Sequence, residues 1–196
     1  MKRTPILLAA FMLSTLGVFG QGQIRFFNNG QTLISTNSMS GGESGLISGA
    51  GNYYFALFVA PAGTADPGDF TFTGFYGTNR STAGILRGGD GVGHVTFPYS
   101  PGTTLSFLVR GWSATIGTDY SAVTSYLSNP TFPGWYGESR IGLNVLGGGA
   151  TPVPDLFGIG VGHLYGFTLE VYGVPEPSSL AFAGLGLAAM WILRRR

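Results

Sequence analysis

Apolar and polar residues alternate with a period of two along the middle of the chain, the pattern of strands with one buried face. The longest alternating stretch is 161–172, and its predicted inward residues are Val161, His163, Tyr165, Phe167, Leu169 and Val171. Two more stretches, 103–110 and 139–146, predict inward residues Leu105, Phe107, Val109, Ile141, Leu143 and Val145. Residues 53–60 are apolar at both alternating sets of positions, which predicts a central strand.

Turn-forming segments separate these strands, for example Asp66-Pro67-Gly68-Asp69 and Gly88-Gly89-Asp90-Gly91. About eight short strands between turns predict an all-β domain, an antiparallel β-sandwich or a jelly roll. Residues 119–127 are ambiguous: Asp119 is a suitable N-cap for a short helix with Tyr120, Val123 and Leu127 on one face.

The N-terminus has the pattern of a secretory signal peptide. Lys2 and Arg3 precede an apolar run from Ile6 to Phe19, and small residues come after it. Cleavage after Gly20 or Gly22 would suit a signal peptidase. We therefore predict a helical signal peptide over residues 1–22 and a domain over residues 23–173.

The C-terminus has a different composition. Its residues before the apolar segment are Val174, Pro175, Glu176, Pro177, Ser178 and Ser179, and its last residues are Arg194, Arg195 and Arg196. Between them, the fourteen residues from Leu180 to Leu193 are all apolar or glycine. As a helix they would span about 21 Å, less than the ~30 Å hydrocarbon core of a bilayer. We expect a marginal transmembrane helix over residues 179–193, with the arginine cluster on the cytoplasmic side.

This tail, residues 174–196, resembles the PEP-CTERM sorting signal of exosortase substrates. The resemblance comprises the tripeptide Pro175–Pro177, the serine pair, the short helix and the arginine cluster. It implies export, recognition by a membrane-embedded exosortase, removal of the helix, and delivery to the cell surface or to an exopolysaccharide-containing biofilm matrix of a bacterium. A permanent single-pass anchor is the alternative for the same residues. The body also loosely resembles glycine- and aromatic-rich PEP-CTERM proteins of unknown activity.

Charge and cysteine content narrow the function of the body. Residues 23–173 contain five arginines, no lysine and eight carboxylates, which gives a net charge of −3. Nucleic-acid binding depends on clustered lysine and arginine, so this balance argues against it. The chain has no cysteine, which excludes disulfides and thiolate chemistry. No nucleophile elbow, phosphate loop or zinc-protease motif is present, so we expect no catalytic residues, no metal and no cofactor.

A few residues remain as candidates for binding. Trp135 and Tyr136 lie in an expected loop, and Trp112 could extend the same platform for stacking on sugar rings. Aspartates in the glycine turns could hold Ca²⁺, although Asp favours turns for local reasons. His163 is expected to be a hydrogen-bonded core residue, and His94 a surface residue.

These patterns predict an exported, non-enzymatic protein of the cell surface or matrix. Its processing partners would be signal peptidase and exosortase, and its C-terminal helix would hold it in the membrane transiently. Two alternatives stay open: a carbohydrate-binding module that acts on extracellular polysaccharide, and a secreted hydrolase. The hydrolase would need two carboxyl groups roughly 5–9.5 Å apart in a cleft.

Overall fold

The computed structural model describes residues 20–37 and 44–173, and these residues form an all-β domain with one short helix. The predicted signal peptide before Gly20 and the predicted transmembrane helix over 179–193 lie outside the described residues. The strands are β1 (Gly22–Arg25), β2 (Ser35–Asn37), β3 (Gly45–Leu46), β4 (Tyr53–Pro61), β5 (Thr71–Asn79), β6 (Leu86–Gly88), β7 (His94–Phe97), β8 (Thr104–Ser113), β9 (Gly134–Glu138), β10 (Gly142–Val145) and β11 (Thr168–Tyr172). The helices are the 3-10 turn η1 (Pro67–Asp69) and α1 (Tyr120–Ser128).

Nine of these strands form one curled sheet in the order β3-β2-β11-β9-β8-β4-β5-β6, with β10 also paired to β8. β4 and β8 are its longest pair, in antiparallel register from Tyr53 opposite Ser113 to Pro61 opposite Leu105. The pairing of β11 with β2 is parallel, and the other strand pairs are antiparallel. β1 and β7 form a separate two-stranded ribbon. The all-β prediction is confirmed. The described strands form one large sheet of nine strands and one small sheet of two strands.

The centre of the sheet is buried on both faces. On one face, Phe55 and Leu57 of β4 pack with Phe107 and Val109 of β8 against the β1–β7 ribbon. On the other, the alternate residues of the same two strands pack against α1. This confirms the prediction of a central strand over residues 53–60, since a strand with two apolar faces needs a layer on each side.

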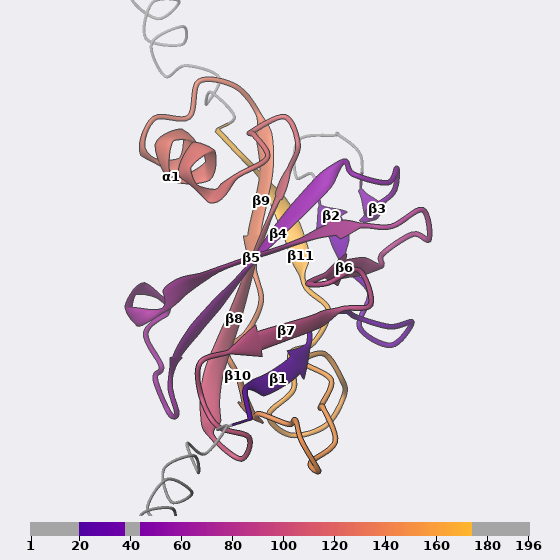
Figure 1. Cartoon of the computed structure of the whole chain (residues 1–196). Coiled ribbons are helices and arrows are strands. Elements are labelled where there is room, and N and C mark those ends of the chain that lie inside the picture. The colour runs from indigo at the N-terminus through magenta and orange to yellow at the C-terminus, as the bar shows by residue number, and fades with distance from the viewer. Residues whose placement is uncertain (1–19, 38–43, 174–196) are drawn as a thin grey trace, which may run out of the picture.

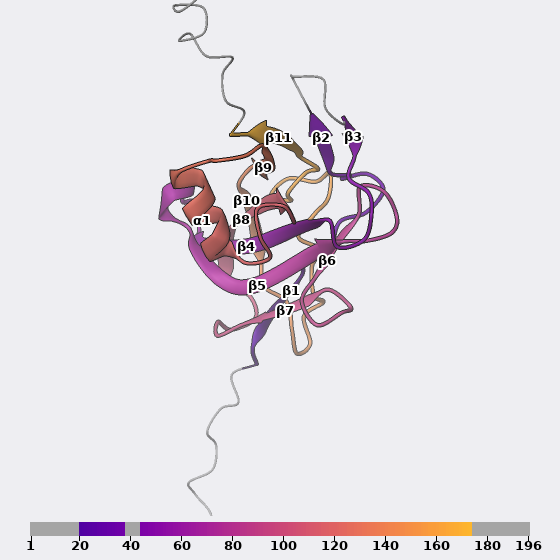
Figure 2. The same ribbon diagram turned by 90° about the horizontal axis from the view of Figure 1, so that it is seen from above.

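The ribbon and the helix lie at opposite ends of the domain in Figure 1. The described chain enters beside β1 at one end and leaves after β11 at the other, near α1 (Figure 1). Figure 2, the view from above, shows the curl of the sheet with α1 beside β4 and β5. The two ends of the described chain, Gly20 and Gly173, therefore lie at opposite ends of the domain.

Helix α1 forms as its local sequence predicts. The Asp119 carboxylate accepts a hydrogen bond from the backbone N–H of Ala122 at 2.9 Å, as an N-cap should. Val123 and Tyr126 are the buried positions of the helix, and Tyr120 and Leu127 are half-buried against the same cluster. The helical alternative for residues 119–127 is the one that the structure adopts.

Two predicted strands differ from the structure. In β10, Leu143 and Val145 are about half exposed, whereas Gly142 and Asn144 face inward. The reason is the returning chain: Leu164 occupies the space that a side chain at Gly142 would need, and Leu143 N–H donates to the Gly162 carbonyl. Loop residues cover this part of the core, so the apolar side chains of β10 are left outside.

The expected long strand 161–172 is a strand only at Thr168–Tyr172. Leu169 is buried, in agreement with the predicted face, but Val161 is fully exposed and Leu164 is buried. Glycines within 158–166 interrupt the ladder, and the chain there forms only an isolated bridge between Phe157 and Leu164. Apolar and polar residues still alternate along residues 161–167, but this segment has no partner strand to determine which side chains point inward.

We expect Trp112→Ala to destabilise the domain by about 3–5 kcal/mol, because it leaves a cavity between the sheet and α1. Trp112 has no exposed surface, and its Nε1 donates to the Gly117 carbonyl at 2.9 Å. Trp135→Ala is the matched control, since Trp135 is only partly buried. Chemical denaturation of both variants measures the difference. Equal losses would contradict the described packing.

Candidate functional site

The predicted sugar-stacking platform is not formed by the three residues named for it. Trp112 is completely buried, with Tyr54, Tyr76 and Tyr120 around its ring. It therefore has no face to offer to a ligand, and the prediction for Trp112 is wrong. Its position in β8 explains this result, because the helix-facing side of β8 is covered by α1.

Trp135 and Tyr136 lie in β9, which is a strand and not the expected loop. β9 runs between β8 and β11, so its backbone is paired on both edges. Consecutive strand residues point to opposite faces. Trp135 packs against the ribbon-side core and Tyr136 against the helix-side core. Both are half-buried, and they do not form one flat surface.

A polar cluster around Arg110 links the sheet to α1. The Arg110 Nε lies 3.0 Å from a carboxylate oxygen of Glu138, and the guanidinium lies over the Phe58 ring at 4.5 Å from its centroid. The same group donates to the Tyr120 hydroxyl at the start of α1 and to the Pro67 carbonyl. These contacts join β8, β9, η1 and α1 at one point.

Tyr136 completes this cluster by donating from its hydroxyl to Glu138 at 2.5 Å. Burial raises the pKa of Tyr136 far above its usual value, and the hydrogen bond to the Glu138 carboxylate raises it further. The hydroxyl therefore stays protonated at physiological pH and acts as a donor. The Tyr136 hydroxyl and the Glu138 carboxylate are hydrogen-bonded to each other. We therefore interpret the cluster as a structural contact between the sheet and α1 rather than as an acid–base pair.

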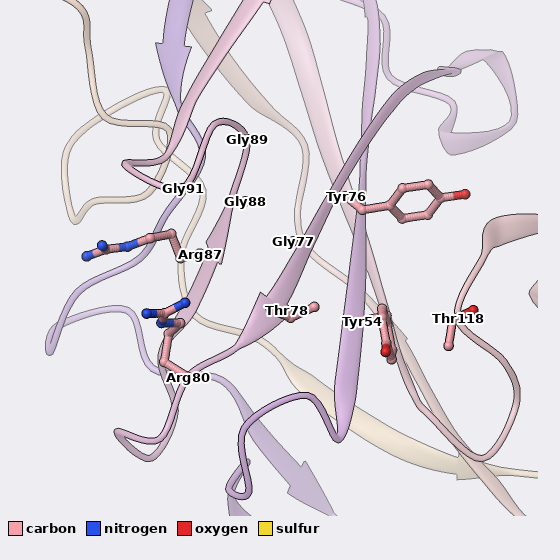
Figure 3. A pocket seen from close by; sticks show the side chains of 10 residues that line it. All are labelled: Tyr54, Tyr76, Gly77, Thr78, Arg80, Arg87, Gly88, Gly89, Gly91 and Thr118. Carbon is pink, nitrogen blue, oxygen red and sulfur yellow. The ribbon is translucent and has the colours of Figure 1, made fainter.

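A separate open pocket lies over β5 and β6, with a volume of about 440 Å³ (Figure 3). Arg80 and Arg87 line one end, and Tyr54, Tyr76 and Thr118 line the other (Figure 3). Glycine backbone from β5, β6 and the following turn contributes the rest of the lining together with Thr78. No carboxylate lines this pocket. We call it the β5–β6 groove.

Sequence reasoning missed Arg80 and Arg87. The available signal was weak: two of five body arginines lie within eight positions and precede a glycine-rich turn. In the sheet, Tyr54 of β4 lies opposite Thr78 of β5, and Thr78 lies opposite Arg87 of β6. This pairing places an aromatic residue and an arginine in one row on the same face of the sheet. That row depends on strand register, which turn segments alone do not specify.

Two of the aspartates in the glycine turns have local roles. Asp66 accepts from the backbone N–H of Gly68 and caps η1. Asp90 accepts from the backbone N–H groups of Val92 and His94, and the bond from His94 lowers the pKa of its carboxyl below the usual value. Among the described residues no group of three His, Asp or Glu side chains is placed to hold a metal ion.

The histidines lie apart from one another. His163 is half-buried, and its Nδ1 is 2.9 Å from the Asp155 carbonyl, so the expected hydrogen bond is present. His94 lies at the end of the ribbon, where its Nδ1 is 3.9 Å from a carboxylate oxygen of Asp90.

The chain leaves the domain at a fixed point. The Tyr126 hydroxyl of α1 lies 2.7 Å from the Phe132 carbonyl and 2.6 Å from the Tyr172 carbonyl. Gly173 then turns with φ +74°, a conformation that favours glycine, and a Cβ added there would lie only 2.7 Å from the Tyr126 hydroxyl. The last strand is therefore held by the helix immediately before residue 174.

Comparison with protein families identifies the segment that begins at this exit. The model of the PEP-CTERM protein-sorting motif matches residues 173–196. The chain therefore carries a PEP-CTERM sorting domain, as the tail predicted, and the match begins directly after the last strand, β11. The motif implies exosortase processing, export and transient membrane anchoring. Comparisons with the curated proteins and with the solved structures found no match.

The predicted sorting residues Val174–Ser179 and Arg194–Arg196 lie within this match and outside the described residues. Within the part of the chain that the structure describes, no helix is long and apolar enough to cross a membrane.

We expect Glu138→Gln to reduce stability by about 1–3 kcal/mol, between the values for exposed and for fully buried ion pairs. The side chains of Arg110 and Glu138 are 15% and 31% exposed, so removing the carboxylate charge leaves a partly buried cation without its partner. Asp155→Asn is the matched control, because the Arg25–Asp155 pair is 42% exposed on both sides. Urea unfolding should show the larger loss for Glu138→Gln. A loss no greater than that of Asp155→Asn would contradict the role of the cluster.

Proposed function

We propose that this chain is a non-enzymatic protein of the cell surface or extracellular matrix, delivered through its PEP-CTERM tail. The supporting observation is the sorting motif at residues 173–196, which comes directly after a firmly anchored last strand. Such an arrangement leaves the body folded and intact when the tail is removed. Signal peptidase would process the N-terminus, and exosortase the C-terminus.

The non-enzymatic character is supported by the roles of the body carboxylates. Five of those that the structure describes already hold a turn, cap a helix or pair with an arginine: Asp66, Asp90, Asp119, Glu138 and Asp155. Glu138 and Glu170 lie on the same face of the neighbouring strands β9 and β11. Glu138 is, however, occupied by Arg110 and Tyr136. These contacts favour a binding or structural role over hydrolysis.

The proposal is tested by mass spectrometry of the exported protein from a host that contains an exosortase. We expect a C-terminus between Pro175 and Ser179, with the peptide from Leu180 to Leu193 missing, because the short apolar segment is a sorting signal rather than a lasting anchor. A variant with alanine at Pro175, Glu176 and Pro177 should keep its tail and remain in the membrane fraction.

The control is the unchanged chain in the same host without its exosortase, where the tail should be retained. Full-length protein held stably in the envelope of the exosortase-containing host would support the permanent-anchor alternative and overturn the proposal.

A further inference from the structure

The arginines of the β5–β6 groove differ from the other arginines of the body in their partners. Arg25 pairs with Asp155 and Arg110 with Glu138, and Arg140 donates to the His163 carbonyl while stacking on Tyr165. Among the residues that the structure describes, neither Arg80 nor Arg87 has a carboxylate within ion-pair distance. The Arg87 guanidinium lies 6.0 Å from the centroid of the Phe27 ring, a distant contact.

Asp90 is the acidic residue closest in sequence to the groove, between the lining glycines Gly89 and Gly91. Its carboxylate is directed into its own turn, where it accepts from two backbone N–H groups and faces His94. It therefore forms no ion pair with either guanidinium group of the groove. In a body with a net charge of −3, two exposed arginines on the same side of one groove form a local positive site (Figure 3).

The rest of the groove suits a polyhydroxylated ligand. Tyr54, Thr78 and Arg87 form one cross-strand row, so the Cα atoms of Tyr54 and Arg87 are two strand spacings apart, about 9.5 Å along the row. Tyrosine offers an apolar ring face and threonine a hydroxyl, and the exposed glycines Gly89 and Gly91 leave the rim of the groove without side chains. Such a groove can contact a ring, a hydroxyl and an anion at the same time.

We propose that the β5–β6 groove binds an acidic polysaccharide, with uronate carboxylates on Arg80 and Arg87 and a sugar ring against the tyrosine end. The planar fork of arginine matches a carboxylate through two parallel hydrogen bonds. This inference deepens the proposed function, because it names the class of matrix polymer that a surface protein would bind.

Nucleic acid is the competing polyanion, and the charge distribution disfavours it. Its affinity comes from many phosphate contacts with clustered basic residues. The groove has two arginines, and the body around it is acidic. A polysaccharide with its charges spaced along the chain needs fewer cations and gains from the aromatic end of the groove.

Binding of the full chain, purified in mild detergent, to polygalacturonate tests the proposal. We expect binding that weakens with added salt, and no comparable binding to methyl-esterified polygalacturonate, which has the same backbone without the charges. In Arg80→Gln/Arg87→Gln, affinity should fall about tenfold or more for each arginine removed, the usual effect of losing a charged hydrogen bond.

The matched control is Arg25→Gln/Arg140→Gln, which makes the same change in net charge away from the groove. Its affinity should stay close to that of the unchanged chain. Arg80→Lys/Arg87→Lys keeps the charge without the planar fork and should bind with intermediate affinity. Thermal unfolding of each variant verifies that the domain is folded.

Three results would overturn the proposal: no binding to polygalacturonate, equal losses in the groove and control variants, or tighter binding to single-stranded DNA than to the polysaccharide. None of these results touches the sorting proposal, which rests on where the exported chain ends. Conversely, a retained tail would leave the groove chemistry unaffected, so the two failures are distinguishable.

Discussion

Burial of β4 and β8 on both faces is the constraint on which the rest of the domain depends. The two strands pair over their full length, and their alternating residues contribute to separate cores. A sheet that is apolar on both sides must be covered on both sides. The β1–β7 ribbon with the loop around Leu156 and Leu164 covers one face, and α1 covers the other.

The short length of α1 determines which part of the sheet face stays open. Nine helical residues extend about 13.5 Å, so α1 covers only part of its face. The Arg110 cluster fixes the helix over β8 and β9, and Tyr76 accepts from the Tyr120 backbone N–H at the border. Beyond that border, β5 and β6 stay open with Arg80 and Arg87 exposed. The same packing that stabilises the core thus leaves the groove uncovered.

Local signals predicted elements well where a single segment carries the information. The N-cap at Asp119, the turn at Asp66 and the central strand over 53–60 all appear as their residues suggest. Alternation also gave the correct ribbon-side face for Leu105, Phe107 and Val109. It gave the wrong face for Leu143 and Val145, because alternation separates two faces without stating which one another segment will cover.

The sequence by itself determined the sorting domain, the absence of cysteine chemistry and the all-β class. The sorting motif is contiguous and is recognised as a linear segment, so it requires no tertiary contact. Tertiary structure alone decided that Trp112 is buried, that Trp135 and Tyr136 face apart, and that Arg80 and Arg87 share a groove without a carboxylate. These properties depend on strand register and on the packing of segments that are far apart in the chain. The composition does not specify which charged residues become neighbours in the folded domain.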